Sequence, residues 1–193
     1  MNILFATNNK HKLEEVQNLL PEGFAIKTPR DCGITEEIPE TADTLEGNAL
    51  MKARYLFDRS NLNVFADDTG LEVEALGGAP GVRSARYATD GHDPEANNKL
   101  LMKNLDGAES RKAQFRTVIA LILDGEEFLF EGIVRGEIAT SYSGSEGFGY
   151  DPIFIPEGES RTFAEMSIDE KGEISHRGRA TRKLVEFLST KSL

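Results

Sequence analysis

The sequence predicts an α/β fold with a mixed β-sheet, and three patterns support this prediction. Short apolar runs typical of strands alternate with segments whose apolar residues recur at helical spacing. Capping signals mark the starts of several of those helical segments. Two long strand-like runs, Ala113–Leu123 and Glu127–Ala139, meet at Asp124-Gly125, which is a strong hairpin signal. We therefore expect helices that flank a mixed sheet with a long hairpin.

The chain is predicted to begin with a strand, a polar turn and a helix. Asn2–Thr7 is a short apolar run rich in strand formers, and His11–Leu20 carries leucine and valine at helical spacing. Phe24–Lys27 is a second candidate strand. Asp43 and Glu46 resemble a capping box, which predicts a helix that starts there and ends near residue 59.

The rest of the chain follows the same alternation. Val64–Ala66 is a candidate buried strand, which Asp67-Asp68-Thr69-Gly70 is expected to end, and Leu71–Ala75 alternates like a half-buried strand. Asp93-Pro94 predicts a helix start with aspartate as N-cap, and His176–Leu188 is the last expected helix. No repeat or linker interrupts the sequence, so we expect residues 1–193 to form a single domain.

Charge and composition exclude several classes of protein. The net charge of −11 argues against a general nucleic-acid binder, whose affinity depends on cationic side chains. The negative net charge of the chain is still compatible with binding of a small phosphorylated ligand, if a local basic site or a metal neutralises the charge of the phosphates. No apolar run approaches the roughly 20 residues that cross a bilayer, and no signal peptide is recognisable. With a single cysteine, Cys32, these features predict a cytoplasmic protein without a membrane partner.

Thr7–Lys12 is a candidate phosphate-binding segment between the first expected strand and helix. A helix N-terminus favours phosphate through its backbone N–H groups and partial positive charge. Hydroxyl, amide and ammonium donors, which this segment carries, suit phosphate oxygens. The alternative is an ordinary polar turn with solvated lysines. The Walker A pattern is absent, so the segment is not an ordinary P-loop.

Asp67 and Asp68 are the candidate metal-binding and catalytic carboxylates. They follow an apolar strand, and strand ends are where α/β folds bind ligands. Adjacent carboxylates repel, so such a pair usually needs a cation or a shared proton, and Mg²⁺ prefers carboxylate, water and phosphate oxygens. One alternative is a turn with exposed acids. Another is an aspartic protease, whose signature contains Asp-Thr-Gly. The expected helices and the acidic Asp67 speak against a protease.

Two later segments are candidates for binding a nucleotide. Gly147–Pro152 places glycines beside aromatic rings, which permits close backbone approach and base stacking, and Asp151 is suited to accept hydrogen bonds from a base or ribose. The alternative is a turn with two buried aromatic residues. Ser175–Ala180 opens the last helix with basic and donor side chains, and Lys171 lies just upstream. The alternative there is a serine-capped helix with surface cations.

Taken together, these segments resemble the inosine/xanthosine triphosphate pyrophosphatase family. Each motif is weak or moderate alone, but five in the family's order, from near the first residue to near the last, are specific. The first two matching motifs are Thr7-x-Asn9-x-x-Lys12 and Ala66–Gly70. The third is Leu76–Gly81 together with Ser84–Arg86, the fourth is Gly147–Pro152, and the fifth is Ser175-His176-Arg177-Gly178-x-Ala180. One departure is Gly47, since the family usually has an acid pair before the Asn-Ala of its second helix.

The resemblance implies a fold, a reaction and a site. It implies an elongated mixed sheet with flanking helices, two lobes around a cleft, a homodimer, and Mg²⁺-dependent hydrolysis of ITP, dITP and XTP to the monophosphate and pyrophosphate. It makes Asp68 the general base, assisted by Asp67, and places the metal on Asp68 and Glu40, with Glu37 as the alternative to Glu40. A non-catalytic nucleotide sensor is a further alternative, against which the acid pair speaks. The substrate-binding residues that it implies are Thr7, Asn8, Asn9, Lys10, His11, Lys12, Thr69, Phe148, Gly149, Tyr150, Asp151, Lys171, His176 and Arg177.

Overall fold

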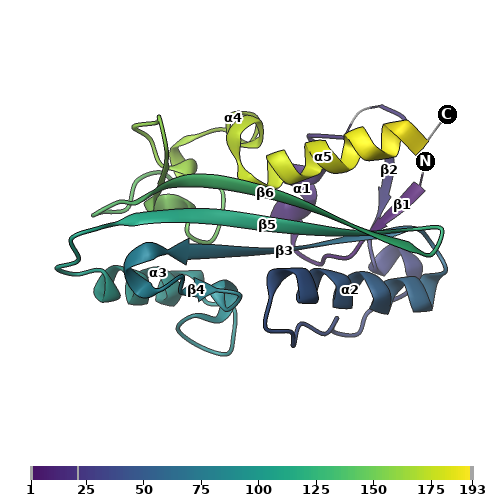
Figure 1. Ribbon diagram of the computed structural model, residues 1–193, viewed down its shortest axis with the longest axis horizontal. Helices are drawn as coiled ribbons and strands as arrows, with labels where there is room; N and C mark the ends of the chain where they lie inside the picture. The colour runs from purple at the N-terminus through teal and green to yellow at the C-terminus, as the bar shows by residue number, and fades with distance from the viewer. Residues whose placement is uncertain (1, 21, 192–193) are drawn as a thin grey trace. The chain divides into compact units, whose positions relative to one another are not determined.

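Seven strands form one mixed sheet in the computed structural model, which describes residues 2–20 and 22–191 (Figure 1). Their order is β2-β1-β3-β5-β6-β7, and β4 pairs with β3. β1 pairs in parallel with β2 and β3, whereas β3–β4 and β6–β7 are antiparallel, so the predicted mixed sheet is confirmed. The strands are β1 Asn2–Phe5, β2 Ala25–Lys27, β3 Val64–Val73, β4 Pro80–Gly81, β5 Lys112–Leu123, β6 Glu126–Ile138 and β7 Phe154–Pro156.

Helices connect most of these strands, as the α/β prediction requires. In the described ranges no helix is both long and apolar enough to cross a membrane. The α-helices are α1 Lys10–Gln17, α2 Leu45–Ser60, α3 Pro94–Asn104, α4 Ile168–Ile174 and α5 His176–Lys191. Short 3₁₀ helices cover Arg30–Cys32, Glu74–Leu76, Ser84–Arg86, Asp151–Ile153 and Phe163–Glu165.

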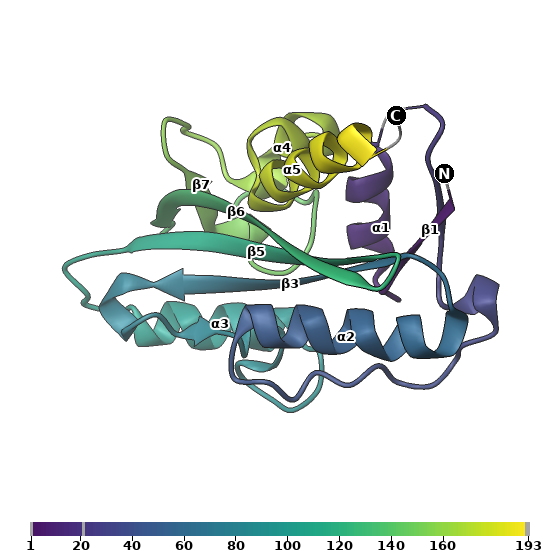
Figure 2. The same ribbon diagram turned by 45° about the vertical axis from the view of Figure 1, so that its right-hand side comes forward.

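The chain divides into two compact units, and the first holds the chain up to Asp68, Thr117–Gly132 and the chain from Arg177 onward. In this unit α1 and α5 lie on one side of the sheet and α2 on the other (Figures 1 and 2). Strand side chains alternate between the two sides, and the segments of β1, β3 and β5 in this unit are buried on both faces, whereas β2 and β6 are more exposed. The core beside α1 and α5 contains Ile3, Phe5, Val16, Phe65, Ile119, Leu121, Leu123, Ala180, Leu184 and Leu188.

The second unit comprises Thr69–Arg116 and Ile133–His176. Its core combines residues of β3, β5 and β6 with Leu101 of α3, Leu105 at the C-cap of this helix, and the aromatic residues that follow β6. Phe115, Phe154 and Phe163 form a cluster of rings with centroids 4.6 to 6.1 Å apart. Asp93 caps α3 by accepting from the N–H of Ala96, which confirms the predicted helix start.

The predicted hairpin is confirmed, and its turn explains the sequence at its tip. β5 and β6 are joined by Asp124 and Gly125, whose φ angles are 53° and 87°. Two-residue hairpin turns that match the twist of the strands need positive φ at both central residues, which aspartate and glycine tolerate.

The structure corrects two local predictions and adds a helix that the sequence did not indicate. β3 does not end before Asp67 but continues to Val73, because both acids are buried and ion-paired or hydrogen-bonded as part of the strand. α2 is capped by Thr44, whose hydroxyl accepts from the N–H of Gly47, rather than by Asp43. The sequence did not indicate α4, which begins after a capping box formed by Ser167 and Glu170.

Candidate functional site

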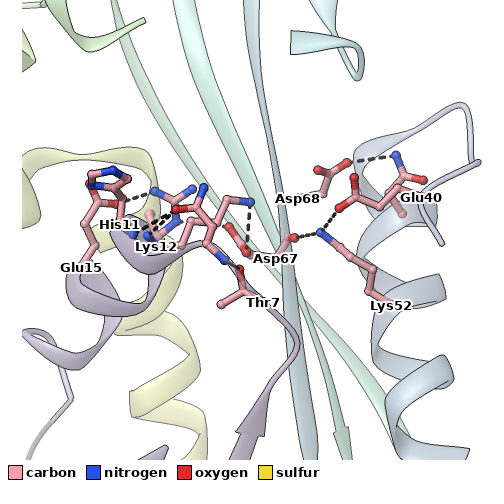
Figure 3. A network of polar contacts seen from close by, with 11 residues as sticks. Thr7, His11, Lys12, Glu15, Glu40, Lys52, Asp67 and Asp68 are labelled. Carbon is pink, nitrogen blue, oxygen red and sulfur yellow. Dashed lines mark hydrogen bonds and ion pairs between the residues drawn. The ribbon is translucent and has the colours of Figure 1, made fainter. Parts of the chain in front are cut away.

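The two adjacent acids of β3 face opposite sides of the sheet. Consecutive side chains of a strand alternate, so Asp67 follows Phe65 toward α1 and α5, while Asp68 points toward α2. Figure 3 shows Lys12 approaching Asp67 from the side opposite to Lys52. Both carboxylates are buried, with 1% of Asp67 and 9% of Asp68 exposed. The two acids therefore have different hydrogen-bond and ion-pair partners, although the charges of Lys12 and Lys52 act on both of them.

Asp67 is surrounded by cations. Lys12 Nζ lies 3.4 Å from its Oδ1, and Arg177 Nε donates to its Oδ2 at 3.1 Å. Lys52 donates to its main-chain carbonyl oxygen. Burial alone raises the pKa of Asp67, but the positive charges of Lys12, Arg177 and Lys52 outweigh burial and hold that pKa well below its usual range. Asp67 is consequently a fixed negative charge.

Arg177 is the most deeply buried cation of this group. Its guanidinium, 1% exposed, bridges Asp67 and Glu15 of α1. Burial lowers the pKa of Arg177, but Glu15 and Asp67 raise it further, so the guanidinium stays charged. The structure places the Arg177 side chain inside an ion triad, and the substrate contact that the sequence suggested for it stays a prediction.

Asp68 has a different environment. Its Oδ2 accepts a hydrogen bond from Asn48 Nδ2 at 3.1 Å. Burial raises the pKa of Asp68, while Lys52 and Lys12 partly oppose that effect. A carboxylate whose pKa is raised takes up a proton more readily, so Asp68 is better suited than Asp67 to act as a base.

Lys52 of α2 joins the loop before this helix to β3. Its Nζ lies 2.7 Å from Glu40 Oε1 and also donates to the carbonyl of Asp67. Burial lowers the pKa of Lys52, but Glu40, Asp68 and Asp67 outweigh it and raise that pKa. Lys52 is therefore a permanent positive charge beside two of the predicted metal ligands.

The donor set fits a magnesium ion that is shared with phosphate. No group of three or more His, Cys, Asp or Glu side chains suited to a metal occurs within residues 2–20 and 22–191. Mg²⁺ typically needs only one or two carboxylates, together with water and substrate phosphates. Glu40 and Asp68 supply two hard oxygen ligands from half-buried and buried positions, whereas Glu37 is exposed. These observations favour Glu40 over Glu37.

The segment Thr7–Lys12 is organised by Asn9, the N-cap of α1. Asn9 Oδ1 accepts from the N–H groups of His11 and Lys12, and Thr7 Oγ1 accepts from the N–H of Asn9. Two of the backbone donors predicted to bind phosphate are therefore used by the cap. Lys12 and Thr7 are half-buried, and the side chains of Asn8, Lys10 and His11 are exposed. Burial lowers the pKa of Lys12, with Asp67 opposing.

The second unit gathers most of the residues predicted to bind the base. Asp151 Oδ2 accepts from Lys171 Nζ at 2.7 Å and from the N–H of Phe148 at 3.0 Å, and both charged side chains are buried. A Cβ on Gly147, whose φ is 71°, would lie 2.1 Å from that carboxylate. The Lys171 ammonium lies 4.7 Å from the centre of the Phe148 ring. Asp151 thus holds a loop that presents Phe148 beside a buried cation.

The neighbours of this loop are also fixed by specific contacts. Tyr150 donates its hydroxyl to the carbonyl of Ser84 at 2.7 Å, and the carbonyl of Gly149 accepts from Asn98 at 3.0 Å. His176 is 3% exposed and stacks on Phe115 with ring centroids 4.5 Å apart. Thr69, directly after Asp68, is half-buried in β3.

Three site residues were not anticipated from the sequence: Glu15, Asn48 and Lys52. Asn48 and Lys52 lie four residues apart on the face of α2 that also buries Ala49 and Ala53, so they are polar residues on an apolar stripe. A buried polar residue needs a partner, and this pattern is the signal that could have indicated them. Glu15 lies beside the buried Val16 on α1 and carries the same signal.

Comparisons with known proteins cover nearly the whole chain. A family model described as the Ham1 family matches residues 3–187. A dITP/XTP pyrophosphatase of Flavobacterium psychrophilum is 51% identical over 187 residues, which cover 97% of this chain and 98% of the relative. One of Porphyromonas gingivalis is 52% identical over 187 residues, 96% of each chain. The solved structure of the Staphylococcus aureus Ham1 protein matches with a TM-score of 0.89 at 38% identity, covering 99% of this chain and 100% of that chain.

Proposed function

This chain belongs to the Ham1 family, and we propose that it hydrolyses non-standard purine nucleoside triphosphates, namely ITP, dITP and XTP, to the monophosphate and pyrophosphate. The observation that carries the proposal is the separation of the two acids of β3. Asp67 is held ionised among cations, whereas Asp68 is a buried carboxylate with a raised pKa. Relatives of this chain that are named dITP/XTP pyrophosphatases support the substrate class.

Asp68 is the proposed general base. It orients a water molecule toward the α-phosphorus and accepts its proton, the new P–O bond forms, and the bond to the bridging oxygen of the leaving pyrophosphate breaks. Asp67 assists by holding the cations Lys12 and Arg177 in place. Lys12, together with the donors of Thr7, Asn8, Asn9, Lys10 and His11, is proposed to bind phosphate oxygens. Most of the rate gain in such reactions comes from positioning and charge neutralisation.

Glu40 and Asp68 are the proposed ligands of Mg²⁺, which when bound neutralises phosphate charge and polarises the phosphorus. Lys52 stabilises the unloaded site, because its ammonium compensates Glu40. A bound cation together with Lys12 would supply the local positive charge that an acidic protein needs in order to bind a triphosphate.

Recognition of the base is proposed for the second unit. Phe148 offers a ring for stacking, and Lys171 offers a buried donor beside it. Hypoxanthine and xanthine carry a 6-oxo acceptor where adenine carries an amino donor. A buried donor opposite that position leaves two donors facing each other when adenine binds, and unpaired buried polar groups discriminate strongly. Gly149, Tyr150, Asp151, Thr69 and His176 are proposed to complete the nucleotide-binding set.

Loss of the Lys171 donor should reduce the preference for ITP over ATP. The double variant Lys171→Met/Asp151→Asn removes the donor without leaving a full charge buried at Asp151. We expect the ratio of kcat/KM for ITP to that for ATP to fall roughly 10-fold or more. Lys99→Met, which removes an exposed lysine of α3, is the matched control and should leave the ratio unchanged. An unaltered ratio in the double variant would assign base recognition to other groups.

The test of the proposed function is release of pyrophosphate from ITP, XTP, GTP and ATP, each with Mg²⁺ and with EDTA. Rapid release from ITP and XTP that EDTA abolishes is expected. Binding of ITP without release would instead identify a nucleotide sensor. Hydrolysis of peptides at acid pH without metal is the result that an aspartic protease requires, and the five α-helices of the described chain oppose it.

We also propose a cytoplasmic homodimer as the active form. The dimer follows from the resemblance of the five motifs, and the cytoplasmic location agrees with the free thiol of Cys32. Light scattering should then give twice the mass of one chain, and a monomer at assay concentration would contradict the dimer.

A further inference from the structure

Asn48 is a buried side chain of α2 that forms hydrogen bonds at both ends. Its Oδ1 accepts from the main-chain N–H of Ala42 at 2.8 Å, and its Nδ2 donates to Oδ2 of Asp68 at 3.1 Å. The residue is 4% exposed. Because an amide offers an acceptor and a donor on one rigid plane, a single side chain joins the loop before α2 to β3.

Steric fit holds the same loop against the first turn of α2. A Cβ on Gly47 would lie 2.7 Å from the Cβ of Ala42 and 2.9 Å from Oγ1 of Thr44. Thr44 Oγ1 also accepts from the N–H of Gly47 at 3.0 Å. A larger residue at position 47 would therefore push residues 42–44 away from the helix.

Lys52 makes a second connection of the same kind, one helical turn after Asn48. It joins Glu40 of the loop to the Asp67 carbonyl of β3, just as Asn48 joins Ala42 to the Asp68 carboxylate. Residues four apart lie on one face of a helix, so the two connections run side by side. Glu40 and Asp68 are thus tied to one rigid element, α2.

We propose that Asn48 is a positioning residue, which fixes the Glu40-bearing loop relative to Asp68 and so sets the separation of the two carboxylates that receive the divalent cation. This inference rests on the proposed function, since that function assigns the metal to Glu40 and Asp68. Asn48 acts through these residues and does not contact the reacting atoms. Residues that orient metal ligands typically change metal affinity or activity by roughly 10–100-fold when they are replaced.

Two variants test this connection, one at both of its ends and one at the loop end alone. Asn48→Leu has a similar volume and removes both hydrogen bonds. Ala42→Pro removes, of the two hydrogen bonds, only the one that Ala42 donates to Asn48, and it also fixes the φ angle of residue 42. We expect each to weaken Mn²⁺ binding without nucleotide, followed by electron paramagnetic resonance, by roughly 10–100-fold. The Mg²⁺ concentration for half-maximal turnover of ITP should rise in parallel, while KM for ITP at saturating Mg²⁺ changes little. The double variant should be no worse than Asn48→Leu, because both substitutions break the same connection.

Asn97→Leu is the matched control. Asn97 is also a buried helical asparagine that bonds a loop at both ends, since it accepts from the N–H of Ala88 at 2.8 Å and donates to the carbonyl of Ala85 at 3.0 Å. We expect a similar loss of melting temperature and an unchanged Mn²⁺ affinity. This comparison separates positioning of the metal ligands from a general loss of stability.

The outcomes are distinct. A folded Asn48→Leu variant with wild-type Mn²⁺ affinity overturns the inference, as does a wild-type chain that binds no Mn²⁺. If Asn48→Leu does not fold, the Mn²⁺ affinity of Ala42→Pro decides in the same way. A wild-type chain that binds Mn²⁺ but releases pyrophosphate from none of the purine triphosphates overturns the proposed function alone.

Discussion

Asp68→Asn is expected to lower kcat for ITP roughly 10²–10⁴-fold, the contribution typical of a positioned general base, with little change in KM. Asparagine keeps the shape of the side chain and an oxygen that can face the water, but it cannot accept a proton. The loss should therefore appear in kcat and kcat/KM alike, which is the signature of an interaction made in the transition state. Release of pyrophosphate at saturating ITP and Mg²⁺ measures it.

Asp67→Asn is the informative comparison for Asp68→Asn. Asp67 lies on the other face of β3 and is ion-paired, so its replacement should mainly weaken the folded state and the binding of substrate through Lys12. Near-wild-type turnover by Asp68→Asn would refute the role of Asp68 as the base. Equal losses of kcat in both variants would mean that the two acids act as a unit despite facing opposite sides.

Arg177→Met is expected to lower the free energy of unfolding by about 3–5 kcal/mol, because it leaves Glu15 and Asp67 buried without their shared cation. Urea denaturation at neutral pH measures the loss. In the double variant Glu15→Gln/Arg177→Met, one buried negative charge is neutralised as well, and part of the lost stability should return. A wholly additive double variant would show that the two groups do not interact.

Arg54→Met provides the control for Arg177→Met. Arg54 pairs with Glu127, and more than a third of each side chain is exposed, so this ion pair should contribute only about 0.2–1 kcal/mol. The Arg177→Met variant could instead have the same urea midpoint of unfolding as the wild type and a raised KM for ITP. Arg177 would then be a substrate contact rather than part of the structural triad. This result would support the role that the sequence motif suggested.

The local elements that the sequence predicts well are those whose signals lie within a few residues. The Asp124-Gly125 turn and the Asp93-Pro94 helix start depend on backbone preferences, and both are confirmed. The family resemblance rests on five short motifs and is also confirmed, by a family model and by relatives about half identical to this chain.

The wrong strand end depends on partners distant in sequence, whereas the wrong cap of α2 lies one residue from the observed cap. Asp67 and Asp68 suggested the end of a strand because buried carboxylates are costly without partners. Their partners, such as Lys12 and Arg177, come from the first and last helices, and no local pattern reveals such contacts. Asn48 and Lys52 also bond residues of β3, and only their place as polar residues on the apolar stripe of α2 could have indicated them. The predicted roles of individual site residues stay predictions until the variants are measured.

The boundary between the two units has a consequence for how this protein can be divided or rebuilt. The chain passes from one unit to the other after Asp68, Arg116, Gly132 and His176, and every crossing falls inside a strand or a helix. Neither unit is therefore a contiguous segment of the chain, and no single stretch of the gene encodes it. No exposed linker joins the two units at these crossings. Exchange of one unit between relatives by recombination would need several simultaneous junctions inside hydrogen-bonded elements. Substrate range in this chain is thus expected to change by point substitution rather than by exchange of modules.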